Sequence, residues 1–579
     1  MKGIVLLWLA GAAGCLAQRP AAVEYLETLR AGRGRIEAAL TGPGGGTLRE
    51  LEQRPGLRHF PHAILVPAVL YTLKRPDNPD FGKPEVLALA LRIGDLLAEE
   101  DERGAYMDRL DSYWDTTMWL DAYRLLQPRL GAERAARWRR ALERNVELVA
   151  PRVEAWRAFP RYTSPYLGTS TNHYAQWGAN VFLAGRLFGR EDWTNTGSAV
   201  LHRFAVEQNA DGFWGELRPD APTSGYNLLT LSAVALYAEH SGDAAAVEAL
   251  RRATRFHLGF TWPSGEPVEL FNDRNRHWEA WLYGNFGFSR TAEGRRLAAY
   301  LMERYQARPL DPEQLGRVAQ NLLYFHEGET AAIPQESAGV FRLPGPAGVR
   351  HGAPWSVALS GLFGQAPATT QWFLDRQASV AVFHREKGLI VSGGNSRNQP
   401  ELATFQERIG GSVTSMPLDA RLEMSETGDR LWVAMNRYFA ELFVAAPTRE
   451  EARLRFTITG RGPAPDEARI ALQLVLVPGQ EIKTGTGLSA VVSEAPIDWG
   501  EGQLGGAVVH NGWTLRLPPG ARLRWPVRPY NPYRQAPERE LSRAVAALSV
   551  ELQLKPDAKQ FVRPGEQLIE FTLRAAAAQ

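Results

Sequence analysis

The period of the hydrophobic pattern changes once along this chain of 579 residues. Up to about residue 330, apolar residues recur at i, i+3, i+4 and i+7, which is the pattern of amphipathic helices. Beyond about residue 335, apolar and polar residues alternate between turns rich in Gly, Pro and Asn, which is the pattern of antiparallel strands. A segment with the helical period would not place its apolar residues on one face if it formed a strand. The change of period therefore predicts two domains of different class. The length alone is also too great for a single core.

The first region contains a series of helical segments separated by loops that carry Gly, Pro or Asp. Examples of these segments are HAILVPAVLYTLKRP, TTMWLDAYRLL, WGANVFLAGRLFG and YNLLTLSAVALYAEH. Sequential helical hairpins of this kind predict an (α/α) toroid, an incomplete barrel of helical hairpins, at residues 18–332. Because no internal repeat establishes that curvature, a plain α-solenoid stays open as an alternative.

The second region, residues 333–579, contains short alternating segments such as ASVAVFHREKGLIVSGGN, ARLRFTITG and IALQLVLVPG. Alternation with a period of two leaves one face of each strand apolar, as expected for antiparallel sheets with one covered face. We therefore expect an antiparallel β-sandwich after the toroid. The predicted fold class is α+β multidomain.

The first residues, MKGIVLLWLAGAAGCLAQ, combine an early Lys with an apolar run and small residues before Gln18. These features predict a signal peptide at residues 1–17, with cleavage after Ala17. The alternative is a lipoprotein signal in which Cys15, the only cysteine, carries a lipid anchor. No later stretch approaches the roughly 20 apolar residues that a membrane helix needs. We expect a secreted or periplasmic protein, with an outer-membrane lipoprotein as the alternative.

The overall charge does not indicate a polyanion-binding protein. The 66 basic and 64 acidic residues give a formal net charge of +2, so nucleic acid is not an expected partner. Any attraction for an acidic glycan must come from local arginines. His and Cys residues show no metal-ligand spacing, and we expect neither a metal nor another cofactor.

Three polar residues suggest one reaction: Asn172 and His173 in TSTNHYAQWGAN, and Tyr226 in DGFWGELRPDAPTSGYNLLTL. A uronic acid loses its C5 proton only if its carboxylate is neutralised, a base takes the proton and an acid protonates the leaving oxygen at C4. An amide can stabilise the developing enolate as an oxyanion hole does, and imidazole and phenol can carry protons. Taken alone, however, Asn172 or the two residues before it could simply cap a helix.

This arrangement resembles the toroidal polysaccharide lyases, the heparinase II/III-like and alginate lyase-like family, which combines an α/α toroid with a β-sandwich. The resemblance implies that Asn172 neutralises the substrate carboxylate. It also implies that Tyr226 acts as acid and often as base, and that His173 supports or replaces it as base. Which of the two removes the C5 proton depends on the face of the sugar ring that carries it. The expected partner is an acidic polysaccharide or oligosaccharide.

Further residues near the motif are candidates for substrate binding. Aromatic faces stack on sugar rings, and guanidinium groups bind carboxylates bidentately. The candidates are Arg161, Trp177, Trp214, Glu216, Arg274, Arg276 and His277, and His351 or His384 is matched to a histidine that relatives supply from the sheet domain. Core packing for the tryptophans and a solvated, ion-paired loop for the arginines are the alternatives.

Two other functions remain open. A glycoside hydrolase on the same toroid would need two carboxylates, one acid and one base. The candidates are Asp111 with Asp115 as the first pair, then Asp121, Glu216, Asp273 and Glu279. A non-catalytic glycan-binding protein would keep the aromatic residues without a converging triad. The interpretation favoured by the motif is an exported polysaccharide lyase that cleaves a uronic-acid-containing chain by β-elimination.

Overall fold

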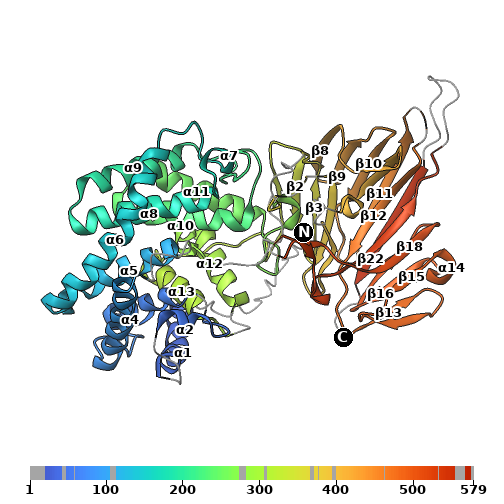
Figure 1. Ribbon diagram of the computed structural model, residues 1–579. Helices are drawn as coiled ribbons and strands as arrows, with labels where there is room; N and C mark the ends of the chain where they lie inside the picture. The colour runs from blue at the N-terminus through green and yellow to red at the C-terminus, as the bar shows by residue number, and fades with distance from the viewer. Residues whose placement is uncertain are drawn as a thin grey trace, which may run out of the picture.

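The computed structural model shows a helical domain beside a domain of β-sheets (Figure 1). It describes residues 20–575 except 42–46, 58, 105–111, 273–281, 306–308, 365–370, 374, 376, 394–398, 462, 464, 533 and 555–566, and except the side chains of 112–115. The predicted signal peptide and Cys15 lie outside the described residues. Within the described part, no helix is both long enough and apolar enough to span a bilayer.

The helical domain consists of two concentric layers. The inner layer runs α3 (Leu65–Thr72), α5 (Ser112–Leu126), α8 (Thr171–Phe188), α10 (Ser224–Ser241), η4 (Asn285–Arg290) and α13 (Pro312–Leu323), and α13 returns to contact α3. The outer layer runs α4 (Pro84–Glu102), α6 (Ala132–Trp156), α9 (Glu191–Val206), α11 (Ala244–Gly259), α12 (Ala292–Tyr305) and α1 (Ala21–Thr41). Shorter elements are α2 (Leu48–Glu52), η1 (Phe60–Ile64), η2 (Gln127–Arg129), α7 (Ser164–Leu167) and η3 (Glu269–Phe271). Inner and outer helices alternate along the chain, and the contact of α13 with α3 closes the hairpins into the predicted α/α toroid.

Residue composition explains which helices lie inside. In α10 every residue from Ser224 to Ala238 is buried, and the polar ones are small or amide side chains. Outer helices such as α6 instead bury one stripe and expose Arg and Glu on the other face. Close packing of the two layers depends on small residues: a Cβ added at Gly197 of α9 would stand 2.6 Å from the backbone nitrogen of Phe182 in α8.

The second domain is a sandwich of two antiparallel sheets. The first sheet has the order β1 (Gly339–Arg342), β2 (Ala347–His351), β3 (Trp355–Ser360), β4 (Ser379–His384), β5 (Gly388–Ser392), β12 (Glu467–Leu474), β21 (Val545–Glu551), β18 (Ala521–Val527) and β15 (Ile497–Trp499), with β6 (Phe405–Ile409) on β12 and β7 (Ser412–Thr414) on β6. The second sheet has the order β14 (Ser489–Val491), β13 (Glu481–Thr484), β16 (Ala507–His510), β17 (Trp513–Arg516), β22 (Gln567–Ala575), β11 (Glu451–Gly460), β10 (Tyr438–Ala445), β9 (Gly428–Ala434) and β8 (Asp419–Ser425). The remaining elements are η5 (Pro400–Leu402), α14 (Glu501–Leu504), η6 (Leu541–Arg543) and the pair β19 (Tyr530–Asn531) and β20 (Ala536–Pro537).

Alternate residues of both sheets meet in one core, as the alternating pattern predicts. Val357 of β3, for example, belongs to the same buried apolar cluster as Leu431 of β9 and Leu442 of β10. The sandwich predicted from the sequence is therefore confirmed. The last toroid helix ends at Leu323 and the first strand begins at Gly339, so the predicted boundary falls between them.

The other face of the first sheet packs against one end of the toroid. Phe383 of β4 stacks on Trp262, which follows the end of α11, with ring centroids 5.5 Å apart. Val349 and Ala358 join the same apolar cluster as Phe256 of α11. Because α10 and α11 form a hairpin, the end where α11 stops is also the end where α10 starts. The N-termini of the inner helices therefore lie at the end of the toroid that faces the sheets.

Candidate active site

The structure places all three predicted catalytic residues in the first turns of two neighbouring inner helices. Asn172 and His173 are the second and third residues of α8, and Tyr226 is the third residue of α10. The two inner helices run parallel because the outer helix α9 lies between them along the chain, and Gln176 Nε2 of α8 donates to Leu229 O of α10 over 2.7 Å, which places their sixth residues side by side. Both N-termini thus point the same way, and the positive ends of the two helix dipoles there favour an anionic ligand.

Asn172 makes a buried contact with a carboxylate. Its side chain has no exposed surface, and its Nδ2 donates to Glu216 Oε1, whose residue is 1% exposed. Ser170 is the N-cap residue of α8, so Asn172 lies within the first turn and its amide is directed at Glu216. Because only the nitrogen of an amide donates to a carboxylate, Glu216 determines which way the Asn172 amide is turned.

The loop between α9 and α10 delivers Glu216 to this position. Trp214 N donates to Asn227 Oδ1 over 2.9 Å, and Trp214 Nε1 donates to Phe204 O over 2.7 Å. Asn227 Nδ2 in turn donates to His257 Nε2 over 2.9 Å. Burial lowers the pKa of His257 to about 3, so this imidazole is neutral and can accept. Asn227 and His257 were not predicted as site residues, and the position of Asn227 directly after Tyr226 was the only available signal.

His173 is half-buried and its ring is oriented by the segment before α8. Its Nδ1 lies 2.8 Å from Thr169 Oγ1, and its ring centroid lies 6.4 Å from that of Trp177. A neutral imidazole that donates from Nδ1 to Thr169 presents the lone pair of Nε2, which is the form a base needs. Tyr226, the other proton carrier, is 8% exposed at the start of α10.

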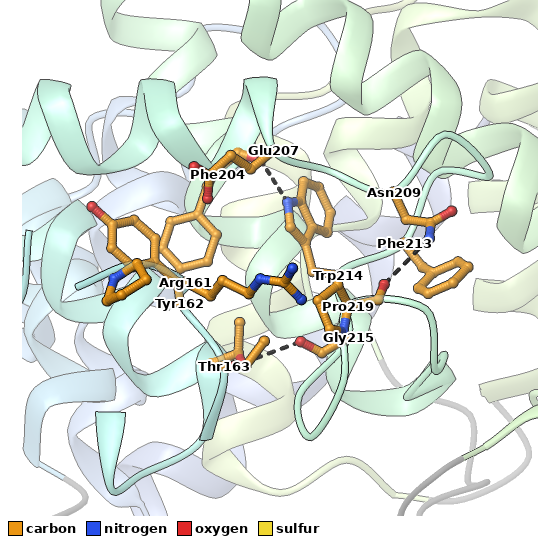
Figure 2. A pocket seen from close by; sticks show the side chains of 12 residues that line it. Arg161, Tyr162, Thr163, Phe204, Glu207, Asn209, Phe213, Trp214, Gly215 and Pro219 are labelled. Atoms are coloured by element: carbon orange, nitrogen blue, oxygen red, sulfur yellow. Dashed lines mark hydrogen bonds between the residues drawn. The ribbon is translucent and has the colours of Figure 1, made fainter. Parts of the chain in front are cut away.

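A pocket of about 340 Å³ lies beside the helix start and the loop that carry Asn172 and Glu216 (Figure 2), but its lining does not include these two residues, His173 or Tyr226. Its lining includes Thr171 and Gly215, the residues directly before Asn172 and Glu216, and the hydroxyl of Thr171 donates to Gly215 O over 3.3 Å. The Arg161 side chain extends across the pocket toward Trp214, as Figure 2 shows. The pocket therefore combines a cation and aromatic walls next to Thr171 and Gly215, the chain neighbours of Asn172 and Glu216.

The charge of Arg161 is not compensated within the pocket. The lining carboxylate, Glu207, pairs with Arg203 Nε over 2.7 Å. Arg203 is held in turn by the backbone oxygens of the chain before Arg161, including Pro160 O at 2.7 Å. Within the described ranges, no carboxylate lies within ion-pair distance of Arg161. This guanidinium is thus available to an acidic group of a ligand.

Other predicted substrate contacts have different surroundings. Trp177 is 4% exposed and packs against Trp156 at 5.5 Å, with the Arg152 guanidinium 5.4 Å from its ring, so it serves as core packing. His351 is 2% exposed, and its Nε2 lies 2.7 Å from Gly259 O at the end of α11. Burial lowers the pKa of His351 to about 4, and the contact joins β2 to the toroid. Arg274, Arg276 and His277 lie outside the described residues.

The carboxylates considered for a hydrolase do not form a described pair. Asp121 is buried and accepts hydrogen bonds from Tyr324 Oη and from Arg124, and Glu216 accepts from Asn172. Asp111, Asp273, Glu279 and the side chain of Asp115 lie outside the described part. Among the side chains that are described, no three His, Cys, Asp or Glu residues cluster as metal ligands.

The sheet domain also borders the loop that carries Glu216. Phe373, from the chain between β3 and β4, packs against Leu217 in a buried cluster, with Trp372 beside it. A separation of more than 150 residues along the chain left no sequence signal for this contact.

Residues 102–312 match the family model described as the ulvan lyase N-terminal domain. This region of the chain is a polysaccharide lyase domain. The polysaccharide lyase family predicted from the sequence motif is thereby confirmed, and the matched range contains the Asn172–Glu216 pair and both helix starts. A comparison with curated protein sequences finds no match.

Two solved structures of lyases are similar to the chain. The chondroitin AC lyase from Streptomyces coelicolor A3, solved with chondroitin sulphate, is 13% identical with a TM-score of 0.49, over 97% of this chain and 80% of that one. A heparan sulfate lyase mutant from Pedobacter heparinus is 10% identical with a TM-score of 0.46, over 93% of this chain and 78% of that one.

Proposed function

We propose that the lyase cleaves a uronic-acid-containing polysaccharide by β-elimination at the starts of α8 and α10. The observation that carries this proposal is the buried amide of Asn172. Glu216 orients this amide, and Asn172 lies in the same helical turn as His173. An amide nitrogen has two hydrogens, and Glu216 accepts one of them. For the other to donate to the uronate carboxylate and stabilise the negative charge that develops when C5 loses its proton, substrate binding must uncover Asn172, which is fully buried in this structure.

The remaining steps fall to the two proton carriers. His173 or Tyr226 removes the C5 proton, the electron pair forms the C4–C5 double bond, and the C4–O bond breaks. Tyr226 gives its proton to the leaving oxygen. His173 lies in the first turn of α8 and Tyr226 in the first turn of α10. The positive ends of these two helices add to the stabilisation of the enolate. Arg161 binds the acidic group of a neighbouring sugar in the adjacent pocket.

The test is the ultraviolet absorbance of the 4,5-unsaturated product. The protein is incubated with ulvan, alginates and glycosaminoglycans, beside Asn172→Ala and Tyr226→Phe variants. We expect absorbance to rise with at least one polymer and to be lost in both variants. New reducing ends without unsaturation would instead establish a hydrolase, and retention of full activity by Asn172→Ala would refute the assigned role of the amide.

We also propose that the protein is exported, on the basis of its first 18 residues. The expected product is a chain that starts at Gln18, in the periplasm or outside the cell. The alternative product is a lipid-anchored chain that starts at Cys15. Mass spectrometry of the N-terminal peptide distinguishes the two, and an uncleaved N-terminus would contradict both.

A further inference from the structure

The outer face of the second sheet carries a band of aromatic and cationic side chains. Strands β8 to β11 pair in register, so their outward residues form rows across the sheet. One row consists of Arg421, Trp432, Glu441 and Thr457, the next of Asp419, Ala434, Phe439 and Thr459, and a third of Glu423, Arg430, Phe443 and Arg455. We call this face the aromatic platform. It is defined by Arg421, Trp432, Phe439, Phe443, Arg455 and Arg461, the residue that follows the end of β11.

The platform is hollowed between its rows. A depression of about 590 Å³ is lined by Trp432 and Phe439, by small side chains such as Ala434 and Thr459, and by the charged residues Asp419, Arg421 and Glu441. Phe439 is 47% exposed, although it occupies a central strand. Exposed aromatic rings beside hydroxyl groups suit a sugar ring, whose C–H face packs on the aromatic ring while its hydroxyls form hydrogen bonds.

Cations surround this depression. Four guanidinium groups lie over platform rings. Arg421 lies over Trp432 at 5.4 Å and Arg461 over Phe439 at 5.0 Å, while Arg430 and Arg455 lie over Phe443 at 4.4 and 5.2 Å. Arg430 pairs with Glu441 over 2.6 Å, but no carboxylate of the described chain lies within ion-pair distance of the other three arginines. Planar guanidinium groups held in this way can bind carboxylate or sulfate groups bidentately.

The platform is separate from the candidate active site. The inward residues of the same strands, among them Leu431 and Leu442, belong to the sandwich core, on whose other side lies the first sheet. That first sheet in turn covers the toroid end near α11. A glycan on the platform therefore lies on the opposite side of the β domain from the starts of α8 and α10.

We propose that the aromatic platform is a second, non-catalytic binding site for an acidic polysaccharide chain. Aromatic rings take the sugar faces, and Arg421, Arg455 and Arg461 take the acidic groups. The choice of an acidic glycan rests on the proposed function, whereas the site itself rests on the platform geometry. By holding the polymer, the platform raises the local concentration of substrate for the distant active site.

Binding is measured on the full chain carrying Asn172→Ala, so that the polymer is not cut. Affinity electrophoresis uses gels that contain ulvan, alginate, chondroitin sulfate or heparan sulfate. The platform variant carries Arg421→Ala with Phe439→Ala, and the matched control is Phe81→Ala, since Phe81 is 45% exposed in the toroid domain. We expect the platform variant to bind the retained polymer about tenfold more weakly, equivalent to about 1.4 kcal/mol, and the control to bind like the parent.

Three results would overturn the proposal. The gel polymers could retard the parent and the platform variant equally, or no polymer could retard the parent. In the third result, the platform variant loses self-association while its retardation by the polymers is unchanged. The last result would assign the platform to a second copy of the chain. Platform-dependent retention without any unsaturated product from the native enzyme would refute the proposed function alone. If the native enzyme forms unsaturated product but the platform substitutions do not change polymer binding, only the proposed platform site is refuted.

Discussion

Gly215 should be indispensable to the position of the loop that carries Glu216. A Cβ built on Gly215 would stand 1.7 Å from Arg218 O and 3.0 Å from Ala221 O. These are backbone atoms, which cannot swing aside like a side chain. Since real Cβ contacts essentially never fall below 3.0 Å, Gly215→Ala must displace the loop by at least the 1.3 Å between 1.7 and 3.0 Å.

That displacement predicts two measurable losses. Overpacking of this kind costs about 1 to 3 kcal/mol of stability, and a misplacement of about 1 Å in an active site can lower the rate about 100-fold. We therefore expect Gly215→Ala to lower both Tm and kcat/KM, because Glu216 no longer orients Asn172. The measurements are thermal unfolding and the rate of ultraviolet absorbance increase.

Gly131→Ala is the matched control for this experiment. Gly131 has a φ of −62° and nothing within 4 Å of its added Cβ, so the same substitution there should leave kcat/KM unchanged and lower Tm only by the cost of replacing the N-cap glycine of α6. If Gly215→Ala keeps the parent kcat/KM, the loop does not position the amide of Asn172. A fall in Tm with an unchanged kcat/KM would confine Gly215 to a structural role.

Three further substitutions have defined outcomes. Arg161→Ala should raise KM with little change in kcat, because a pocket cation contributes binding that is equal in ground and transition states; a loss confined to kcat in steady-state kinetics would contradict this. Glu216→Gln should lower kcat about tenfold, since a hydrogen bond to a charged group contributes about 1.4 kcal/mol more than a neutral one, whereas Glu216→Ala should lower it further; equal kinetics of Gln and Ala variants would exclude an orienting role. Burial raises the pKa of Glu269 from 4.5 to about 7, although it accepts from Trp262 Nε1 and Gly393 N. As pH rises from about 4.5 to about 7, the unfolded state loses this proton while the folded state keeps it, so the free energy of unfolding should fall by about 3 kcal/mol. Urea unfolding at about pH 5 and pH 8 should show that Glu269→Gln removes this fall.

Local sequence patterns were sufficient for the domain classes and for the starting point of the site. The change from helical to alternating periodicity predicts toroid and sandwich, because each period determines which face of an element is apolar. Asn172, His173 and Tyr226 could be identified because their chemistry suits one reaction. The structure then placed them in first helical turns, with Asn172 directed at Glu216 rather than used as a cap.

Tertiary structure alone decided what covers each face. The sequence could not show that Trp177 packs into the core, that His351 joins the sheet to Gly259, or that Phe373 borders the loop of Glu216. It also could not align Arg421 with Trp432 on one exposed face. The physical reason is that periodicity specifies an apolar face but not its partner, and partners separated by many residues meet only when helices close a ring and strands take their register.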